Sequence, residues 1–186
     1  MLKDVKNAVC NEDGTITCDV QPDGVDHYLP YTAGPNDASE FGQELWKQLM
    51  VGAWGAPAPF VVTAEMVEAG KEQKRQEINA WRDAQEHASY VFKFNDHSWD
   101  YGKVSQARLE PVAMLAKRGQ LPEGFFWTDA HNHDIPMTAD EVMALEAAMI
   151  GAMVAKGFEI HRHQRELKAA LDKLTTLDEV RAFKVA

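Results

Sequence analysis

The feature that most constrains the fold is a long amphipathic pattern near the carboxyl end of the chain. Apolar positions recur there at helical spacing, and the stripe comprises Val142, Leu145, Met149, Ala152, Ile160, His163, Leu167, Leu171 and Leu174. Thr138 and Glu141 have the spacing of a capping box just before this stripe. Acidic residues gather in the first turns and basic residues in the last, which suits the helix macrodipole. One long helix is therefore predicted, with a short helix from Thr176 to about Phe183 after it.

The first 62 residues have a different character, because turn signals separate short β-capable runs. Asp13-Gly14 lies between two such runs and predicts a hairpin. This turn would place Cys10 opposite Thr17 and Val9 opposite Cys18, a register that argues against a disulfide between the two cysteines of the chain. The sequence therefore predicts two free thiols in an antiparallel pair of strands.

The rest of the amino-terminal region predicts one more strand and one helix. An extended run covers residues 27–32. A helix should follow over about 38–50, with Asp37 as its cap and Glu40 completing a capping box. The segment 55–59 contains two prolines, which remove backbone donors and end regular structure. We place a domain boundary there and predict a small β-rich domain over residues 1–62.

The remaining chain predicts a polar helix over residues 63–89 and a mainly helical domain over residues 90–186. The polar helix has few large apolar side chains, so it is either a connector in solvent or an oligomerising helix. Two short hairpins are expected around residues 95–97 and 130–133, and Pro111 should kink or divide a helix over about 103–118. The predicted fold class is α+β.

Charge and hydropathy limit the partners that we expect. The formal net charge is -10, which disfavours binding to nucleic acid. Residues 1–62 hold nine acidic and three basic side chains, so this region should favour a basic partner surface. No signal peptide and no run of 18 apolar residues occurs, so we expect no membrane association and a protein that stays where it is made.

The sequence contains no catalytic motif that we can assign. Phosphate-binding loops, dinucleotide fingerprints, nucleophile elbows and zinc-protease helices are all missing, so we expect no enzyme activity and no cofactor. His131 and His133 are the alternative, because alternate residues of a strand share a face and could chelate a metal. A metal-dependent hydrolase would need these two histidines and a distant carboxylate, whereas the simpler reading is a solvated turn.

Large aromatic residues are the candidate partner-binding positions. They lie at or near the proposed domain boundary, and large aromatics often anchor interfaces; they are Trp46, Trp54, Phe60 and Trp81. The alternative is that Trp46 belongs to a core and Trp54 packs under its own loop. If the polar helix self-associates, we expect Trp81 to be its main anchor and the protein to be a homo-oligomer.

Two ordered series of short motifs resemble phage proteins. The amino-terminal series resembles the first module of small phage tail and tail-fibre-assembly proteins, and it consists of Val5-Lys6-Asn7-Ala8-Val9, Ile16-Thr17-Cys18-Asp19-Val20, Tyr28-Leu29-Pro30-Tyr31-Thr32-Ala33-Gly34-Pro35-Asn36-Asp37 and Gly52-Ala53-Trp54-Gly55. Residues 90–183 resemble a module of unassigned function from phage and prophage tail-region proteins, on Phe92-Lys93-Phe94, Trp99, Ser105-Gln106-Ala107-Arg108-Leu109, Phe126-Trp127-Thr128, Met137-Thr138-Ala139-Asp140-Glu141 and Leu177-Asp178-Glu179-Val180.

This resemblance implies a role in the tail region and carries no catalytic residues to transfer. The function that we expect is a tail-fibre assembly factor, or chaperone, that binds a fibre subunit in the host cytoplasm. The alternative is a minor structural component of the tail tip, baseplate or fibre attachment that remains in the virion tail. The expected partner is accordingly a phage tail-fibre or tail-tip protein.

Overall fold

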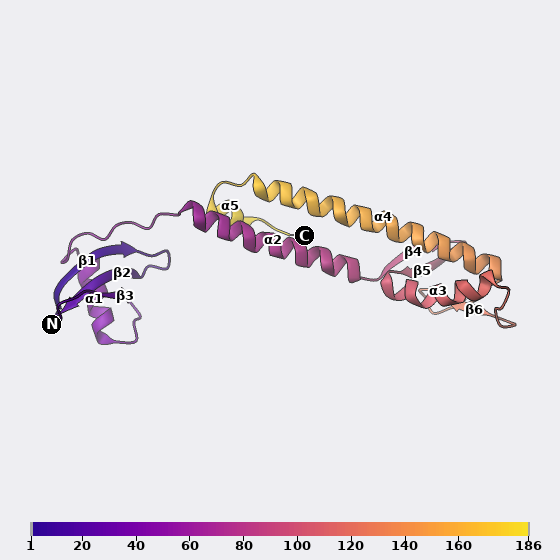
Figure 1. Ribbon diagram of the computed structural model, residues 1–186, viewed down its shortest axis with the longest axis horizontal. Coiled ribbons are helices and arrows are strands. Elements are labelled where there is room, and N and C mark those ends of the chain that lie inside the picture. Colours follow the sequence, from indigo (N-terminus) through magenta and orange to yellow (C-terminus); the bar gives the residue numbers. More distant parts are fainter. Residues whose placement is uncertain (1, 186) are drawn as a thin grey trace. The chain divides into compact units, whose positions relative to one another are not determined.

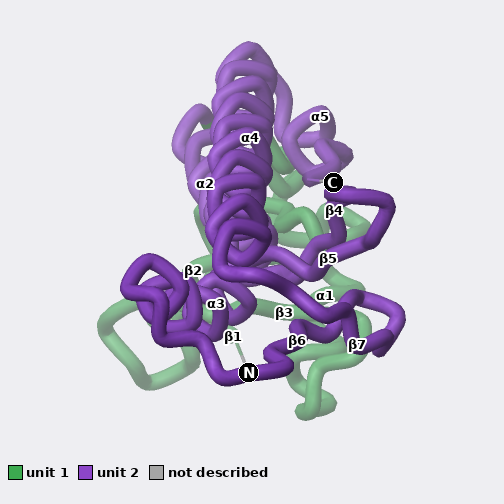
Figure 2. Tube along the Cα trace, turned by 90° about the vertical axis from the view of Figure 1, so that its right-hand side faces the viewer, with its two compact units in different colours: residues 1–63 green, residues 64–186 purple. Residues whose placement is uncertain are grey.

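The chain folds into two compact units, and both combine helices with small antiparallel sheets. The structure is a computed structural model that describes residues 2–185 (Figure 1). Its compact units are residues 1–63 and 64–186, which Figure 2 colours separately. The helical content lies mainly in the second unit, and the sheets have two or three strands each. The predicted α+β class is confirmed.

The first unit is a three-stranded sheet with one helix packed on one face. Its strands are β1 (Leu2–Cys10), β2 (Ile16–Pro22) and β3 (Leu29–Ala33), in the order β1-β2-β3. Successive side chains of a strand point to opposite faces, so one face carries the apolar set that meets helix α1 (Glu40–Met50). The core that results comprises Val5, Ile16, Cys18, Val20, Ala33, Leu45 and Leu49.

The predicted hairpin forms, but its register was predicted wrongly by one residue. Val9 pairs with Thr17 and Cys10 with Ile16. The connection is longer than a two-residue Asp-Gly turn, because the Asn11 amide donates to the Thr15 carbonyl at 2.8 Å. The pairing is also interrupted between Lys6 and Val9, where the chain takes a positive φ. Both cysteines are free thiols, and burial raises the pKa of Cys18.

Helix α1 begins and ends with well-defined caps, although the amino-terminal cap differs from the predicted one. Ser39 is the cap and accepts a hydrogen bond from the Gly42 amide at 3.0 Å, while Asp37 holds Ser39 in place through its amide. At the other end Gly52 has a φ of 73°, and the Ala53 amide donates to the Gln48 carbonyl at 2.9 Å. This is a Schellman ending, and it turns the chain back along the last turn of α1.

The second unit contains four helices and two hairpins. Its elements are α2 (Ala64–His87), β4 (Tyr90–Phe94), β5 (His97–Tyr101), α3 (Lys103–Lys117), β6 (Phe126–Thr128), β7 (Asp134–Pro136), α4 (Ala139–Asp172) and α5 (Leu177–Ala182). Thr138 and Thr176 cap α4 and α5, and each forms the predicted capping box with the glutamate three residues later. The predicted long helix is thereby confirmed.

Two separate cores form on opposite halves of α4. Near its start, α4 packs against α3 and the hairpins, in a core of Trp99, Leu109, Ala113, Ala116, Val142, Leu145 and Met149. Near its end, Ile78 of α2, Leu171 of α4 and Val180 of α5 form a smaller core. Between Met149 and Ile160 no described residue of α4 is buried. The helix therefore links two cores through a more exposed stretch, in which the half-buried Met153 packs against the first core.

Helix α2 covers most of the segment that was predicted to be a connector or an oligomerising helix, and it packs within its own chain. It lies beside α4 in both views (Figures 1 and 2). Gln164 of α4 donates to Asn79 at 3.0 Å, and Arg75 forms an ion pair with Asp172 at 3.1 Å. Ile78 is fully buried. A few well-placed contacts thus hold a helix whose sequence is mostly polar.

The first hairpin of the second unit and the proline-containing helix are more regular than predicted. Asn95 and Asp96 both have positive φ, so a two-residue turn joins β4 to β5 and His97 belongs to the strand. Helix α3 runs through Pro111 and is not divided. Pro111 is exposed. The helix loses one backbone donor there and keeps its packing on the opposite side, through Leu109 and Ala113.

Candidate interaction surfaces

The four aromatic residues proposed for partner binding are divided between the two units. Trp46, Trp54 and Phe60 belong to the first unit, and Trp81 belongs to the second. Trp46 and Trp54 both pack in part against the core of the first unit. Both are half-buried, as is Phe60. The structure therefore brings two of the four residues to one core and leaves part of each ring accessible.

Hydrogen bonds fix the two indole rings of the first unit in place. Trp46 Nε1 donates to the Gly14 carbonyl at 3.0 Å, which ties α1 to the loop between β1 and β2. Trp54 Nε1 donates to Gln48 Oε1 at 2.9 Å, across the Schellman ending of α1. Because the polar atom of each ring has a partner, the accessible parts of both rings are apolar. These rings are rigid, and a partner could contact them at low entropic cost.

Exposed aliphatic side chains lie between these two tryptophans in the sequence, at the end of α1. Met50 is 56% exposed and Val51 81% exposed. Met50 lies one helical turn after Trp46 and so shares its side of the helix. We call Trp46, Met50, Val51 and Trp54 the α1 terminal surface. Sequence analysis identified only its two tryptophans, because Met50 follows the same apolar pattern as the buried Leu45 and Leu49.

Phe60 lies in the segment that follows the α1 terminal surface. In this segment Ala58 bridges to β1: its amide donates to the Ala8 carbonyl, and the Cys10 amide donates to its carbonyl, both at 2.8 Å. Pro57 and Pro59 flank this bridge and lack amide hydrogens. The predicted boundary segment thus covers part of the β1 edge, and Phe60 follows it half-buried.

The Trp81 side chain of α2 contacts another helix of the same chain. Its ring meets the His163 ring of α4 edge to face, with 4.9 Å between the centroids. This contact is within one chain and joins α2 to α4. Trp81 therefore has a structural use that does not require a second copy.

His131 and His133 lie around the turn between β6 and β7, where Asp129 organises the backbone. One Asp129 oxygen accepts the amides of His131 and His133 at 2.8 and 2.9 Å. The amide hydrogen bond from His133 is the main cause that lowers the pKa of Asp129. The two imidazole centroids are 6.3 Å apart. Within residues 2–185 no group of three potential ligands is placed to hold a metal ion.

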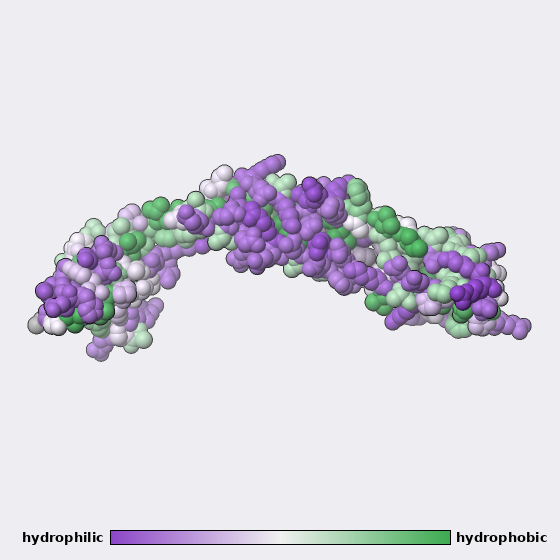
Figure 3. Space-filling view, viewed as in Figure 1, coloured by the Kyte–Doolittle hydropathy of each residue, from purple (hydrophilic) through white to green (hydrophobic). Residues whose placement is uncertain are grey.

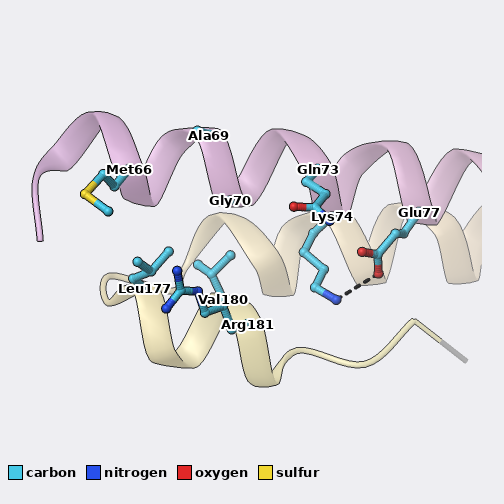
Figure 4. A pocket seen from close by; sticks show the side chains of 9 residues that line it. All are labelled: Met66, Ala69, Gly70, Gln73, Lys74, Glu77, Leu177, Val180 and Arg181. Carbon is cyan, nitrogen blue, oxygen red and sulfur yellow. Dashed lines mark hydrogen bonds and ion pairs between the residues drawn. The ribbon is translucent and has the colours of Figure 1, made fainter. Parts of the chain in front are cut away.

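A groove of about 440 Å³ lies between α2 and α5 (Figure 4). Gly70 is at its centre, where an added Cβ would lie 3.2 Å from Leu177 and from Val180, so glycine allows α5 to approach α2 closely. Lys74 also lines the groove and forms an ion pair with Glu77 at 2.8 Å. The lysine charge is thus already balanced beside this groove.

The outward side of α4 has an apolar surface that was not predicted from the sequence. Ile150, Val154 and Phe158 are 45%, 67% and 68% exposed. Figure 3 shows hydrophobic surface over the middle of α4. The signal was present in the sequence, since these residues are four apart, but the stronger inward stripe of the same helix obscured it.

Comparison with known protein families gives a match in the second part of the chain. A family model described as a domain of unknown function, DUF4376, matches residues 69–185. No curated protein and no solved structure matches the chain. No helix within residues 2–185 has the length and apolar character needed to cross a membrane.

Proposed function

We propose that this chain, which belongs to the DUF4376 family, is a phage tail-fibre assembly factor whose first unit binds a fibre subunit. It acts by binding and not by catalysis, as a homo-oligomer in the host cytoplasm while tails assemble. The observation that carries this proposal is the α1 terminal surface, where two indoles held by hydrogen bonds and two exposed aliphatic side chains occur between Trp46 and Trp54.

This surface has the composition of a protein-binding site. Contiguous apolar side chains are costly to leave in water, and such patches commonly mark interaction sites. Tryptophan is enriched among the residues that dominate binding energy. Trp46 and Trp54 are pre-ordered by hydrogen bonds to Gly14 and Gln48, so little side-chain entropy is lost when a partner covers them.

Charge indicates what kind of partner surface fits. The first unit has nine acidic and three basic residues in positions 1–62, and Lys47 is its only basic residue on α1. A fibre subunit with basic residues around an apolar centre would be attracted to this unit and then held by the aromatic surface. The charge would mainly speed association, and the apolar contacts would slow dissociation.

The resemblance of the amino-terminal motifs to tail-fibre-assembly proteins supports a fibre subunit as the partner. Part of that resemblance, Gly52-Ala53-Trp54-Gly55, forms the turn that presents the α1 terminal surface. The same residues that resemble the assembly proteins are therefore those that shape the proposed binding site.

Co-expression with a phage tail-fibre subunit tests the proposal. We expect more soluble fibre trimer and co-purification of the two proteins. An unchanged yield of soluble fibre together with no co-purification would overturn the proposal.

A pair of matched variants locates the binding site. Val51→Lys places a charge on the α1 terminal surface that opposes a basic partner, and a cation at a helix carboxyl end does not disturb α1. We expect fibre retention to fall at least about fivefold. Asn36→Lys adds the same charge at an exposed position before the start of α1 and should keep wild-type retention. Equal retention by both variants would exclude the α1 terminal surface.

The same surface would serve a minor structural component of the tail tip, baseplate or fibre attachment. Mass spectrometry of purified particles separates this role from that of an assembly factor. Peptides of this chain at trace level or below support the assembly factor. Stoichiometric peptides would instead assign the chain to the virion tail.

A further inference from the structure

A regular seam runs along the outward side of α4. Its positions are spaced alternately four and three residues apart, which is the spacing of a coiled-coil seam, and they are Asp140, Ala144, Ala147, Gly151, Val154, Phe158, His161 and Arg165. All eight residues are exposed. We infer that two copies of this chain pair in antiparallel fashion along this seam, which we call the outward seam.

The central part of the outward seam is uncharged. From Ala144 to Phe158 every seam position is apolar or glycine, and Val154 and Phe158 are 67% and 68% exposed. Charged residues of the same stretch point elsewhere: Glu146 pairs with Lys117 of α3 at 2.7 Å, and Lys156 lies over the Tyr90 ring. The chain thus leaves an apolar strip on a helix whose charges are directed to its sides and inward face.

Gly151 would allow a partner helix to approach the outward seam closely. Glycine inside a helix costs about 1 kcal/mol relative to alanine. An added Cβ at Gly151 would meet nothing within 4 Å, so no contact within the chain requires glycine there. A second helix that approaches closely at this point would require it, because a Cβ would then lie between the two backbones.

An antiparallel arrangement pairs the seam positions favourably. In this arrangement the two seams run in opposite directions, so residues at the start of one seam face residues at the end of the other. Phe158 then lies opposite Ala147 of the second copy, and Val154 lies opposite Gly151. Each of these facing pairs therefore combines a larger residue with a small one. Such pairs fill the space between two helices evenly.

Charge complementarity selects the antiparallel direction. Asp140 would face Arg165 of the second copy, and symmetry repeats this pair at the other end of the seam. Neither side chain has an ion-pair partner within residues 2–185. In a parallel dimer Asp140 would face Asp140, and Arg165 would face Arg165. Like charges at both ends would oppose that arrangement.

The proposed function includes a homo-oligomer, and the inferred dimer is a specific form of it. The inference rests on the proposed function in that respect. It requires no fibre protein, however, so it is tested with this chain alone. The apolar centre is short, which predicts a dissociation constant in the micromolar range, roughly 1–50 μM.

Sedimentation velocity of the full chain over a concentration series tests the inference. We expect a concentration-dependent monomer–dimer equilibrium. Phe158→Glu should weaken the dimer at least about tenfold, because it places a charge in a central layer. Val104→Glu is the matched control, since Val104 is also exposed, at 57%, but lies on α3. It should leave the equilibrium unchanged.

A charge exchange tests the direction of the two helices. Asp140→Arg alone and Arg165→Asp alone should each weaken the dimer at least about fivefold, because each creates two like-charge pairs. The double variant restores opposite charges in the antiparallel arrangement and should recover wild-type affinity within about twofold. Circular dichroism of each variant establishes that α4 is still folded.

Three results would overturn the inference. They are a monomer at all concentrations up to about 200 μM, a dimer that Phe158→Glu and Val104→Glu affect equally, and a double charge variant that is weaker than either single one. An unsubstituted chain that binds the fibre but stays monomeric would refute this interface alone. Loss of fibre binding with a retained dimer would refute the proposed function alone.

Discussion

The inward and outward faces of α4 are both apolar and both periodic, yet only one is buried. On the inward face Val142, Leu145 and Met149 are at most 2% exposed, because α3 and the hairpins cover them. On the outward face Val154 and Phe158 remain about two-thirds exposed. The difference is that the buried inward residues are large, whereas the outward seam has Ala144, Ala147 and Gly151 in succession before its two large apolar residues. Periodicity identifies an apolar face, and residue size indicates what kind of neighbour can cover it.

The largest difference between the two faces is expected in the free energy of unfolding, when a buried side chain of the inward face is shortened. Leu145→Ala leaves a cavity in a core where Leu145 is completely buried, and it should lower the free energy of unfolding by about 3 kcal/mol. Urea unfolding followed by circular dichroism measures this loss. Phe158→Ala is the control on the outward seam and should cost less than about 0.5 kcal/mol at concentrations where the chain is monomeric. Similar losses of unfolding free energy for both variants would contradict the difference between the two faces.

A smaller change in monomer stability, this time an increase, is expected from a substitution at Gly151. Gly151→Ala improves helix propensity, and its Cβ meets no atom of the same chain, so the monomer should become more stable by about 1 kcal/mol. The same change should weaken the dimer, because the added methyl group separates the two helices. Urea unfolding of dilute protein and sedimentation at high concentration measure the two effects. A destabilised monomer would show that glycine is needed within the chain.

The smallest effect concerns the capping box on which both faces depend. Hydrogen bonds from the Thr138 amide and then its hydroxyl lower the pKa of Glu141 below its ordinary value of 4.5. A lowered pKa in the folded state means that the stabilisation is fully present above the unfolded pKa and is lost as the pH falls through the folded pKa. Glu141→Gln should therefore be less stable than wild type at pH 7, and the difference should shrink at pH 3. Urea midpoints at both pH values test this, and a gap that grows on acidification would contradict it.

Local signals in the sequence predicted much of the fold. The capping boxes at Thr138 and Thr176 and the inward stripe of α4 were predicted, because they depend on spacing within one segment. The register of β1 with β2 was missed by one residue, because Asn11 bonds to Thr15 and lengthens the turn beyond Asp13-Gly14. The packing of α2 was missed as well, since Ile78 has few apolar neighbours along its own helix and is buried by residues almost a hundred positions away.

The candidate surfaces were predicted less completely than the fold. Trp46 and Trp54 were selected because of their size, and the structure places both at the surface of one core. Met50 and Val51 were not selected, because only the Schellman turn at Gly52 determines which side of the helix end remains open. The outward seam was overlooked because alanine and glycine carry little weight in a hydrophobic pattern, although they decide how closely two helices can approach.

The stretch of α4 between Met149 and Ile160 has a consequence for local opening. The helix is anchored at both ends by cores, and its middle has backbone hydrogen bonds but no buried side chain. Local opening is cheapest where few tertiary contacts must break. Amide exchange along α4 should therefore follow the reverse of ordinary end fraying, with slow exchange towards both ends and faster exchange in the centre. A helix of 34 residues would then behave as two cooperative units joined by a weakly anchored segment that a neighbouring molecule would protect.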